Sequence, residues 1–305
     1  MHLVFQSKAK PFVKWAGGKT QLLEQFKALL PKDFDQWENV TYIEPFVGGG
    51  AMLFFLLQHF QNISRVIIND INKNLTNTYL NVKNDAEQLV EELKQLEQEY
   101  LALSDYEKQK LYYLEKRHRF NNDVLESIEK SALLIFLNRT CFNGLYRENS
   151  KGEFNVPFGK YNNPTICNEE VIYADSELLN YFDVNVMNGD FLEIERVIEK
   201  SGNVFIYFDP PFRPLNTTSS FNSYVKEEFD DRRQVELSEL CRRLSVYGNV
   251  SWMLSNADCS AKNPNDTFFE TLYSGFNIHR VYASRSVNAN GSKRGKLTEL
   301  LITNY

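Results

Sequence analysis

The chain has 305 residues, of which 43% are hydrophobic and 24% are charged, and its formal net charge is −6. A chain of this length can bury a full core and form one large domain or two modest ones. The negative net charge argues against general adhesion to nucleic acid, while local basic patches can still bind it. No apolar run reaches the roughly 20 residues of a membrane helix, so we expect a cytoplasmic protein without a membrane partner.

The cysteines and histidines do not form a pattern that suggests a metal site or a disulfide framework. The four cysteines have no paired spacing, and the four histidines do not group near them. We therefore expect reduced, buried thiols and no bound metal, in a protein that acts as a monomer. The cysteines are Cys141, Cys167, Cys241 and Cys259.

The first distinctive segment, KWAGGKTQLL, ends its glycine pair with Gly18-Lys19-Thr20, as a nucleotide triphosphate loop does. That loop also needs a glycine at the position of Val13, where a β-branched residue disfavours the required turn. Apolar residues follow at helical spacing until Pro31. The segment is thus expected to be a glycine turn that opens a helix and suits an anion or a small ligand, with a nucleoside triphosphatase as the weaker alternative.

Seven apolar segments predict the strands of one sheet. Helical patterns separate the early ones, which favours an α/β fold: a Rossmann-like sheet with helices on both faces. The predicted strands are 40–43, 65–68, 184–187, 204–208, 250–254, 278–283 and 300–303.

A second glycine turn, in YIEPFVGGGAMLFFLL, joins the first strand to a helix. The dinucleotide fingerprint would require a further glycine at Leu53, so the NAD pattern fails. Asp70 ends the next strand, about twenty residues after the glycines, where a carboxylate can bind both ribose hydroxyls. Its alternative role is that of a turn-forming acid. Asp190 ends a later strand and is placed to bind an adenine amine, with Phe191 beside the ring. This combination suits a nucleoside without a diphosphate, and S-adenosylmethionine fits.

The composition changes between about residues 72 and 167. Charged amphipathic helices are predicted at about 86–101, 105–120 and 123–137, and a basic, aromatic segment follows at 138–161. Aromatic side chains among basic ones favour nucleic-acid binding, because bases stack on aromatic faces. We interpret 73–167 as an inserted helical recognition domain with a hairpin at about 139–160, and 1–72 with 168–305 as the catalytic core.

The segment VFIYFDPPFRPLNTTSSF carries the candidate chemistry. An apolar strand ends in Asp209-Pro210-Pro211-Phe212, at the sheet edge where open α/β folds bind ligands. The two prolines fix a rigid corner. Asp209 and the Pro210 carbonyl can accept both N–H groups of an aromatic amine, which frees its lone pair, while Phe212 stacks on the base. Methyl transfer then depends on positioning and needs no metal. Without the other segments, an Asp at the end of a strand before a proline turn would have an alternative interpretation as a common structural turn.

These segments together resemble the Dam-like DNA adenine N6-methyltransferases of the α group, the D12 class. The likeness runs from Pro11 to about Leu300, and it implies S-adenosylmethionine as methyl donor. The motifs that carry it, in the family's order, are residues 14–19 (KWAGGK), 45–50 (PFVGGG), 69–70 (ND), 189–191 (GDF) and 209–212 (DPPF). The positions that we expect to contact the donor are Trp15, Ala16, Gly17, Lys19, Phe46, Gly48, Gly50, Asp70, Asp190, Phe191 and Asp209.

The resemblance also implies roles in duplex DNA binding. Phe142 would wedge into the base stack, Asn143 would support the orphaned partner base, Leu145 and Arg147 would read base edges, and Lys14 would contact a guanine. A phosphate contact is the alternative for Arg147. The sequence after Phe212 resembles family members that modify adenine in GATC. Further expected DNA contacts are Arg139 and Lys160, and Lys293 and Arg294 from a second basic segment that has no acidic residue.

One departure and several alternatives accompany this interpretation. Most relatives carry Tyr at the position of Phe212, so we expect an effect on rate or base selectivity without a change of reaction. Cytosine N4 methylation is the main alternative, although such enzymes typically place Ser before the paired prolines. A protein methylase would show Asn there, and a regulatory DNA-binding protein that merely holds the donor is a further alternative. The sequence leaves open whether a restriction endonuclease acts on the same site.

The hypothesis depends on where the fold places Asp209. Asp209 must lie beside the pocket bounded by Gly48 and Asp70, and we expect its carboxylate not to be buried in an ion pair.

Overall fold

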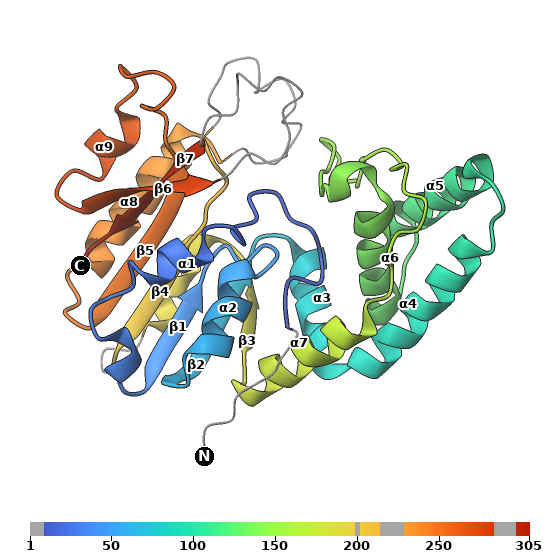
Figure 1. Cartoon of the computed structure of the whole chain (residues 1–305), viewed down its shortest axis with the longest axis horizontal. Helices are drawn as coiled ribbons and strands as arrows, with labels where there is room; N and C mark the ends of the chain where they lie inside the picture. Colours follow the sequence, from blue (N-terminus) through green and yellow to red (C-terminus); the bar gives the residue numbers. More distant parts are fainter. Residues whose placement is uncertain (1–8, 199–201, 214–228, 284–296) are drawn as a thin grey trace.

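The computed structural model describes residues 9–198, 202–213, 229–283 and 297–305. Within these residues seven strands form one sheet in the order β3-β2-β1-β4-β5-β7-β6 (Figure 1). Neighbouring strands from β3 to β5 are parallel, and β7 runs antiparallel to both β5 and β6. The α/β prediction is confirmed, with all seven strands near their predicted places. The strands are β1 (Val40–Glu44), β2 (Ile63–Asp70), β3 (Asn185–Asn188), β4 (Val204–Phe208), β5 (Val250–Ala257), β6 (Asn277–Ala283) and β7 (Leu297–Thr303).

The sheet is buried on both faces because its central strands are continuously apolar. All five residues of β1 and of β4 are buried. Successive side chains of a strand point to opposite faces, so Tyr42 and Ile43 belong to two different hydrophobic cores. The two cores hold the carboxyl ends of the central strands at one fixed edge.

Helices cover both faces, as predicted. The core that contains Ile43 also contains residues of α8 (Asp231–Leu244), α9 (Phe268–Leu272) and the 3-10 helix η3 (Phe191–Val197). The core that contains Tyr42 receives residues of α1 (Leu23–Lys27), α2 (Ala51–His59), α3 (Lys73–Asn84) and α7 (Glu169–Tyr181). A short 3-10 helix, η1 (Phe34–Gln36), precedes β1.

The helix expected directly after the first glycine pair is shorter than the spacing predicts. The Leu22 N–H donates to the Lys19 carbonyl in a turn, and α1 begins only at Leu23. After Lys27 the backbone changes to bonds between residues three apart, from Leu29 to Phe26 and from Leu30 to Lys27. The apolar residues are buried as expected, but the turn leaves Lys19 directed inward.

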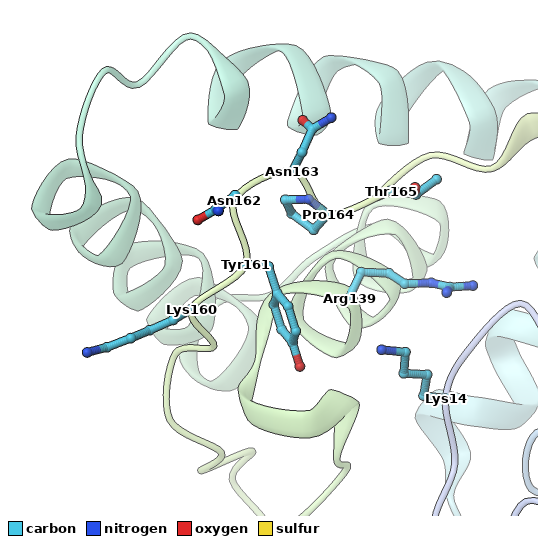
Figure 2. Close-up of a pocket in the computed structure, with 8 residues that line it drawn as sticks. All are labelled: Lys14, Arg139, Lys160, Tyr161, Asn162, Asn163, Pro164 and Thr165. Atoms are coloured by element: carbon cyan, nitrogen blue, oxygen red, sulfur yellow. The ribbon is translucent and has the colours of Figure 1, made fainter. Parts of the chain in front are cut away.

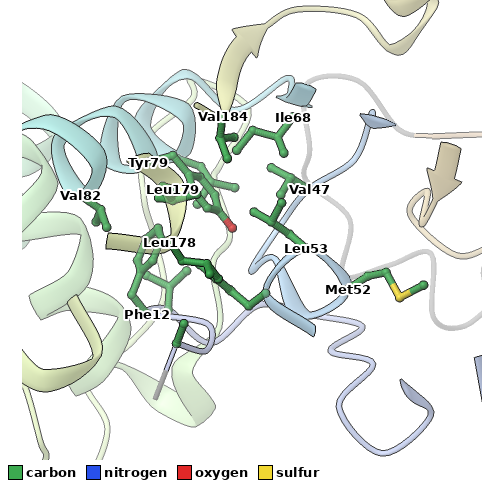
Figure 3. Close-up of a cluster of buried hydrophobic side chains, with 14 of the residues drawn as sticks. Phe12, Val47, Met52, Leu53, Ile68, Tyr79, Val82, Leu178, Leu179 and Val184 are labelled. Carbon is green, nitrogen blue, oxygen red and sulfur yellow. The ribbon is translucent and has the colours of Figure 1, made fainter. Parts of the chain in front are cut away.

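Three helices, α4 (Ala86–Leu101), α5 (Tyr106–Asn122) and α6 (Ser127–Thr140), confirm the predicted helical segments. Figure 1 shows them grouped to one side of the sheet, beyond α3 and α7. Figure 3 shows how α3 joins the two parts: Tyr79 and Val82 pack with Leu178 and Leu179 of α7 beside the sheet. The hydrophobic core is therefore continuous from the sheet into the helical region. The exact domain boundaries at 72 and 168 stay a prediction.

The hairpin expected at about 139–160 is not a regular two-stranded ladder. It is a loop with two isolated antiparallel bridges, Cys141 to Phe158 and Glu148 to Phe154. A turn closed from Gly152 N–H to the Asn149 carbonyl forms its tip, and the loop begins with the 3-10 helix η2 (Phe142–Gly144). The Phe154 and Val156 side chains pack into the core. The Val156 carbonyl accepts from Tyr113 and Arg117 of α5 and not from the facing part of the loop.

In the described part of the chain, no helix is long and apolar enough to cross a membrane. The same residues contain no group of three or more His, Cys, Asp or Glu side chains that could hold a metal ion.

Candidate active site

The carboxyl ends of four neighbouring strands meet at one edge of the sheet. In the strand register, Glu44 of β1 lies opposite Ile68 of β2, and Phe208 of β4 lies opposite Leu254 of β5. Since β1 separates β2 from β4, Asp70 at the end of β2 and Asp209 directly after β4 lie on either side of the segment that follows β1. The fold thus brings together residues that are far apart in the sequence, as the hypothesis requires.

The glycine turn after β1 is shaped by conformation and by close contacts. Gly48 and Gly50 have φ angles of 48° and 75°, which other residues rarely adopt. A Cβ atom at Gly48 would lie 2.8 Å from Trp15 Cδ1, and one at Gly50 would lie 2.5 Å from the Tyr79 hydroxyl. The Trp15 indole therefore rests directly on the turn, and Tyr79 fixes it further by donating to the Gly48 carbonyl at 3.0 Å.

Asp70 ties the end of β2 to this turn. Its Oδ2 accepts from the Gly48 N–H at 3.1 Å, and its Oδ1 accepts from the Asn72 N–H at 2.9 Å. Burial raises the pKa of the Asp70 carboxyl, and these backbone hydrogen bonds oppose the rise. Each carboxylate oxygen can accept more than one hydrogen bond, so the ribose role predicted for Asp70 is compatible with both contacts.

Asp209, directly after β4, lies in a compact polar cluster. Its Oδ1 is 3.0 Å from the Lys19 ammonium and accepts from the Ser255 hydroxyl at 2.7 Å. Burial raises the pKa of the Asp209 carboxyl, while Lys19 and Ser255 lower it. The Lys19 ammonium also donates to the Gly17 carbonyl at 2.5 Å and lies 4.3 Å from the centre of the Phe212 ring. Lys19 thus touches both ends of the Asp-Pro-Pro-Phe segment.

The expectation that Asp209 avoids a buried ion pair is wrong. Lys19 has only 3% of its side chain exposed, and a buried ammonium requires an anionic partner, which Asp209 provides. The pairing does not occupy the whole carboxylate, however. Both contacts involve Oδ1, the side chain is 20% exposed, and no described residue hydrogen-bonds to Oδ2. Among the described residues, Oδ2 of Asp209 therefore has no competing hydrogen-bond donor.

The proline corner is fixed by hydrogen bonds from residues that the sequence analysis did not identify. The Gln234 side chain donates to the Pro211 carbonyl at 3.1 Å, and Asn256 donates to Gln234 at 3.1 Å. Within the described residues, no hydrogen bond engages the Pro210 carbonyl, the predicted second acceptor. Polar residues at the end of the strand next to β4, namely Ser255 and Asn256, were the signal available in the sequence.

A group of aromatic rings lies on the other side of the same edge. The rings of Phe46 and Phe191 are 5.2 Å apart, and Arg233 lies over Phe191 at 4.6 Å. Asp190 accepts from the Leu192 N–H at 2.9 Å through Oδ1 and forms an ion pair with Arg233 through Oδ2. The structure brings Phe46 and Phe191 together as expected, whereas both oxygens of Asp190 already have protein partners. Its contact with an adenine amine stays a prediction.

The sequence comparison decides the family. Residues 15–287 match the family described as "D12 class N6 adenine-specific DNA methyltransferase". The chain belongs to this family. It is a site-specific, adenine-specific DNA methyltransferase, and the cytosine N4 alternative is not supported.

Similar proteins cover the whole length of this methyltransferase. A "Type II methyltransferase M.MjaIII" of Methanocaldococcus jannaschii is 47% identical over 98% of this chain and 100% of its own length. A "Type II methyltransferase M1.LlaDCHI" of Lactococcus lactis subsp. cremoris is 39% identical over 100% of this chain and 99% of its own. A "DNA adenine methylase" of Haemophilus influenzae is 34% identical over 96% of this chain and 93% of its own.

The loop predicted to read DNA presents its key side chains outward. Phe142 is 52% exposed and Leu145 is 39% exposed, so both apolar side chains can contact a ligand without rearrangement of the core. Asn143 has a left-handed backbone with φ of 57°. The exposed Arg147 donates to the Asn155 side chain at 2.7 Å, so its guanidinium is oriented by the loop itself.

Three predicted DNA-binding cations border one pocket of about 410 Å³, lined also by Tyr161 and residues 162–165 (Figure 2). Lys14 points toward the ring of Tyr161, with its ammonium 5.5 Å from the ring centre. Arg139 is partly buried and donates to the Phe12 carbonyl at 2.7 Å, so part of its role is structural. Lys160 is exposed. Lys293 and Arg294 lie outside the described residues.

The segment of residues 14–19, predicted to bind the donor, and the loop predicted to read DNA meet at Trp15. Its indole stacks on the Tyr146 ring, with centres 4.9 Å apart and planes at 22°. Ala16 and Gly17 follow in the exposed part of the same segment. Tyr146, which the sequence analysis treated only as part of an aromatic pattern, is therefore a neighbour of the predicted donor pocket.

Proposed function

We propose that this methyltransferase uses S-adenosylmethionine to methylate adenine N6 within GATC, after flipping the adenine out of duplex DNA. The observation that carries the proposal is the position of Asp209. Its Oδ1 is held by Lys19 and Ser255, while Oδ2 and the neighbouring Pro210 carbonyl have no hydrogen-bond donor among the described residues. Such a pair of acceptors matches the two hydrogens of an exocyclic amino group.

The residues present fit the proposed donor. The glycine turn and the Asp70 carboxylate suit a nucleoside, and the rings of Phe46 and Phe191 suit an adenine face. The edge also carries negative charge: Glu299 lies 3.8 Å from Lys19, and its buried Oε2 has no hydrogen-bond partner among the described residues. Carboxylates at this place favour a cationic sulfonium. When bound, S-adenosylmethionine supplies an electrophilic methyl group.

The chain itself orients and activates the amine. Acceptance of both N–H groups by Asp209 and Pro210 turns the nitrogen lone pair out of the base plane, toward the methyl carbon. Positive charge would develop on the nitrogen as the N–C bond forms and the S–C bond breaks, which leaves a neutral thioether, and the Asp209 carboxylate would stabilise that charge. The nitrogen would then lose one of its protons to solvent. Lys19 helps to keep Asp209 ionised, because it opposes the effect of burial on the carboxyl pKa.

Base flipping is supported by the exposed Phe142 side chain. Extruding a base costs a few kcal/mol, and an aromatic wedge in the vacated stack together with stacking on Phe212 offsets part of this. Phe212 is half-buried, and its ring contacts the Lys19 ammonium. Lys14 and Lys160, at the border of the pocket, would contact the DNA backbone or a neighbouring base.

Site specificity for GATC rests on the resemblance of the segment after Phe212, which lies mostly outside the described residues. Two of the relatives carry the name type II methyltransferase. We infer that a restriction endonuclease that cleaves the same site is a cognate partner, and that methylation protects DNA from it.

The deciding experiment maps the product. Unmethylated plasmid is incubated with the protein and S-adenosylmethionine, and modified bases are located at single-base resolution. Methyl groups only on the adenine of GATC would support the proposal in full. Adenine methylation at another sequence would overturn the GATC assignment and leave the reaction intact, whereas no transfer from this donor would refute the cofactor assignment.

A further inference from the structure

Asn138, near the end of α6, connects residues 14–19, predicted to bind the donor (the donor segment), to residues 142–147, predicted to read DNA (the recognition loop). Its side chain is fully buried. Its Oδ1 accepts from the Lys14 N–H at 2.8 Å, and its amide nitrogen donates to the Lys14 carbonyl at 2.8 Å and to the Gly144 carbonyl at 3.0 Å. The amide therefore pairs with both backbone groups of Lys14, as a neighbouring strand would, and uses its second N–H for the recognition loop.

The loop also touches Lys14 directly, at a place where only glycine fits. Gly144 has a φ of 63°. A Cβ atom there would lie 2.4 Å from Lys14 Cδ and 3.0 Å from Lys14 Cβ. The Lys14 side chain thus crosses the face of Gly144, and the position of one segment determines the position of the other.

A second contact extends this connection to the donor pocket. Trp15, the next residue after Lys14, stacks on Tyr146 of the recognition loop and rests on Gly48. Two consecutive residues of the donor segment are therefore fixed against the loop, and one of them forms a wall of the glycine turn.

We propose that Asn138 is a positioning residue that couples recognition of the DNA sequence to methyl transfer. It touches neither the base nor the donor in this proposal; it holds Lys14 and Trp15 in register with the loop of residues 142–147. A loop that is displaced on a wrong sequence then shifts Lys14 and Trp15, so the donor pocket is correctly formed only on the right sequence. The inference rests on the proposed roles of these two segments.

A buried asparagine can also serve stability only, and the chain offers a matched control. Asn81, on α3, is likewise buried and donates to the Ser127 carbonyl at 2.8 Å and to the Ser127 and Ser131 hydroxyls at 3.0 and 2.8 Å. These contacts lie within the helical region and involve neither Lys14 nor the recognition loop. Loss of either amide leaves buried polar groups unpaired and should lower the melting temperature.

The test compares Asn138→Ala with Asn81→Ala. For each variant, kcat/KM is measured on a duplex with the recognition sequence and on a duplex in which one base pair of that sequence, other than the pair with the target adenine, is substituted. The ratio of the first value to the second measures discrimination. We expect Asn138→Ala to reduce the ratio of the two values by about tenfold or more, mainly through a lower kcat on the correct duplex. Asn81→Ala should keep the wild-type ratio despite a comparable loss of melting temperature.

Two results would overturn the proposal: a folded Asn138→Ala enzyme with the wild-type ratio, or an equal fall of the ratio in both variants. Should Asn138→Ala not fold, Gly144→Ala disturbs the same contact from the loop, and unaltered discrimination in that folded variant would overturn the proposal equally. Failure of the proposed function itself is seen separately, because the wild-type enzyme would then not methylate the duplex with the recognition sequence.

Discussion

The ammonium of Lys19 lies 3.0 Å from the Asp209 carboxylate, although the two residues lie 190 positions apart (209 − 19) in the sequence. The pair joins the first glycine segment to the Asp-Pro-Pro-Phe corner after β4. Lys19 also contacts the Phe212 ring and approaches Glu299 of β7. One buried cation thus organises the part of the site where the amino group is proposed to bind.

The first prediction concerns this cation. Lys19 lowers the pKa of the Asp209 carboxyl, so Lys19→Met should raise that pKa further. Because the ionised carboxylate is the active form, the acidic limb of the pH–rate profile should move to higher pH. Single-turnover rates across pH measure the shift. Lys27→Met, which alters an exposed lysine of α1, is the control, and an unshifted profile in Lys19→Met would contradict the assigned role.

Asp209→Ala should abolish methyl transfer while the donor still binds. The substitution removes the acceptor for the amine and the charge that stabilises it, and we expect a fall in kcat of about 10²–10³-fold or more. Asp209→Asn keeps an acceptor oxygen and should retain more activity than the alanine variant. Donor affinity is measured by calorimetry in parallel. Full activity of Asp209→Ala would remove the basis of the proposed function.

Ser255→Ala tests whether the carboxylate must be held in place. The Ser255 hydroxyl donates to Asp209 at 2.7 Å, and hydrogen bonds to charged groups are worth about 1.5–3 kcal/mol. We expect a roughly tenfold or greater fall in kcat with little change in KM for DNA. Ser251→Ala, at the opposite end of β5, provides the control. A loss confined to KM would argue for a role in DNA binding instead.

Arg147 and Lys160 should differ in what they contribute to DNA binding. If Arg147 reads a guanine, Arg147→Ala should reduce discrimination at one base pair by about 1–3 kcal/mol. Lys160→Ala should instead weaken binding to all sequences alike and reduce the salt dependence by about one phosphate contact. Binding titrations at several salt concentrations separate the two effects, and identical behaviour of the variants would refute the division.

Glu44 provides a prediction about stability. It is buried at the end of β1 and accepts from the Tyr42 hydroxyl at 2.8 Å. Burial raises its pKa well above the ordinary value, the Tyr42 hydrogen bond opposes this, and the charge of Asp209 adds to the rise. A carboxyl whose pKa is raised on folding contributes stability at low pH, and this contribution is lost as pH rises through the folded-state pKa.

Glu44→Gln keeps the side chain neutral at every pH. Its melting temperature relative to wild type should therefore increase as pH rises from about 5 to about 8. Calorimetric scans at several pH values measure this difference, and Glu24→Gln, which alters an exposed carboxyl of α1, is the control. A difference that is constant with pH would show that Glu44 ionises without cost in the folded protein.

The strands could be predicted from the sequence because each is a short apolar run bounded by turn residues. β4 was predicted with its observed bounds, and α4 likewise. The loop after α6 was harder to predict. Its basic and aromatic residues indicated an exposed binding segment. Its two isolated bridges accompany long-range contacts, such as the hydrogen bonds from Tyr113 and Arg117 to the Val156 carbonyl, which local sequence does not reveal.

The sequence by itself determined the fold class and the family, because strands, glycine turns and the Asp-Pro-Pro-Phe segment follow one another in a characteristic order. It also predicted which segment would carry the reaction. Only the tertiary structure decided which side chains share a charge or a hydrogen bond: Lys19 with Asp209, Ser255 with Asp209, and Asn138 with Lys14. Such contacts join residues from distant parts of the chain. They form because a buried charge or amide must find a partner within the packed interior, and the packing alone determines which partner is near.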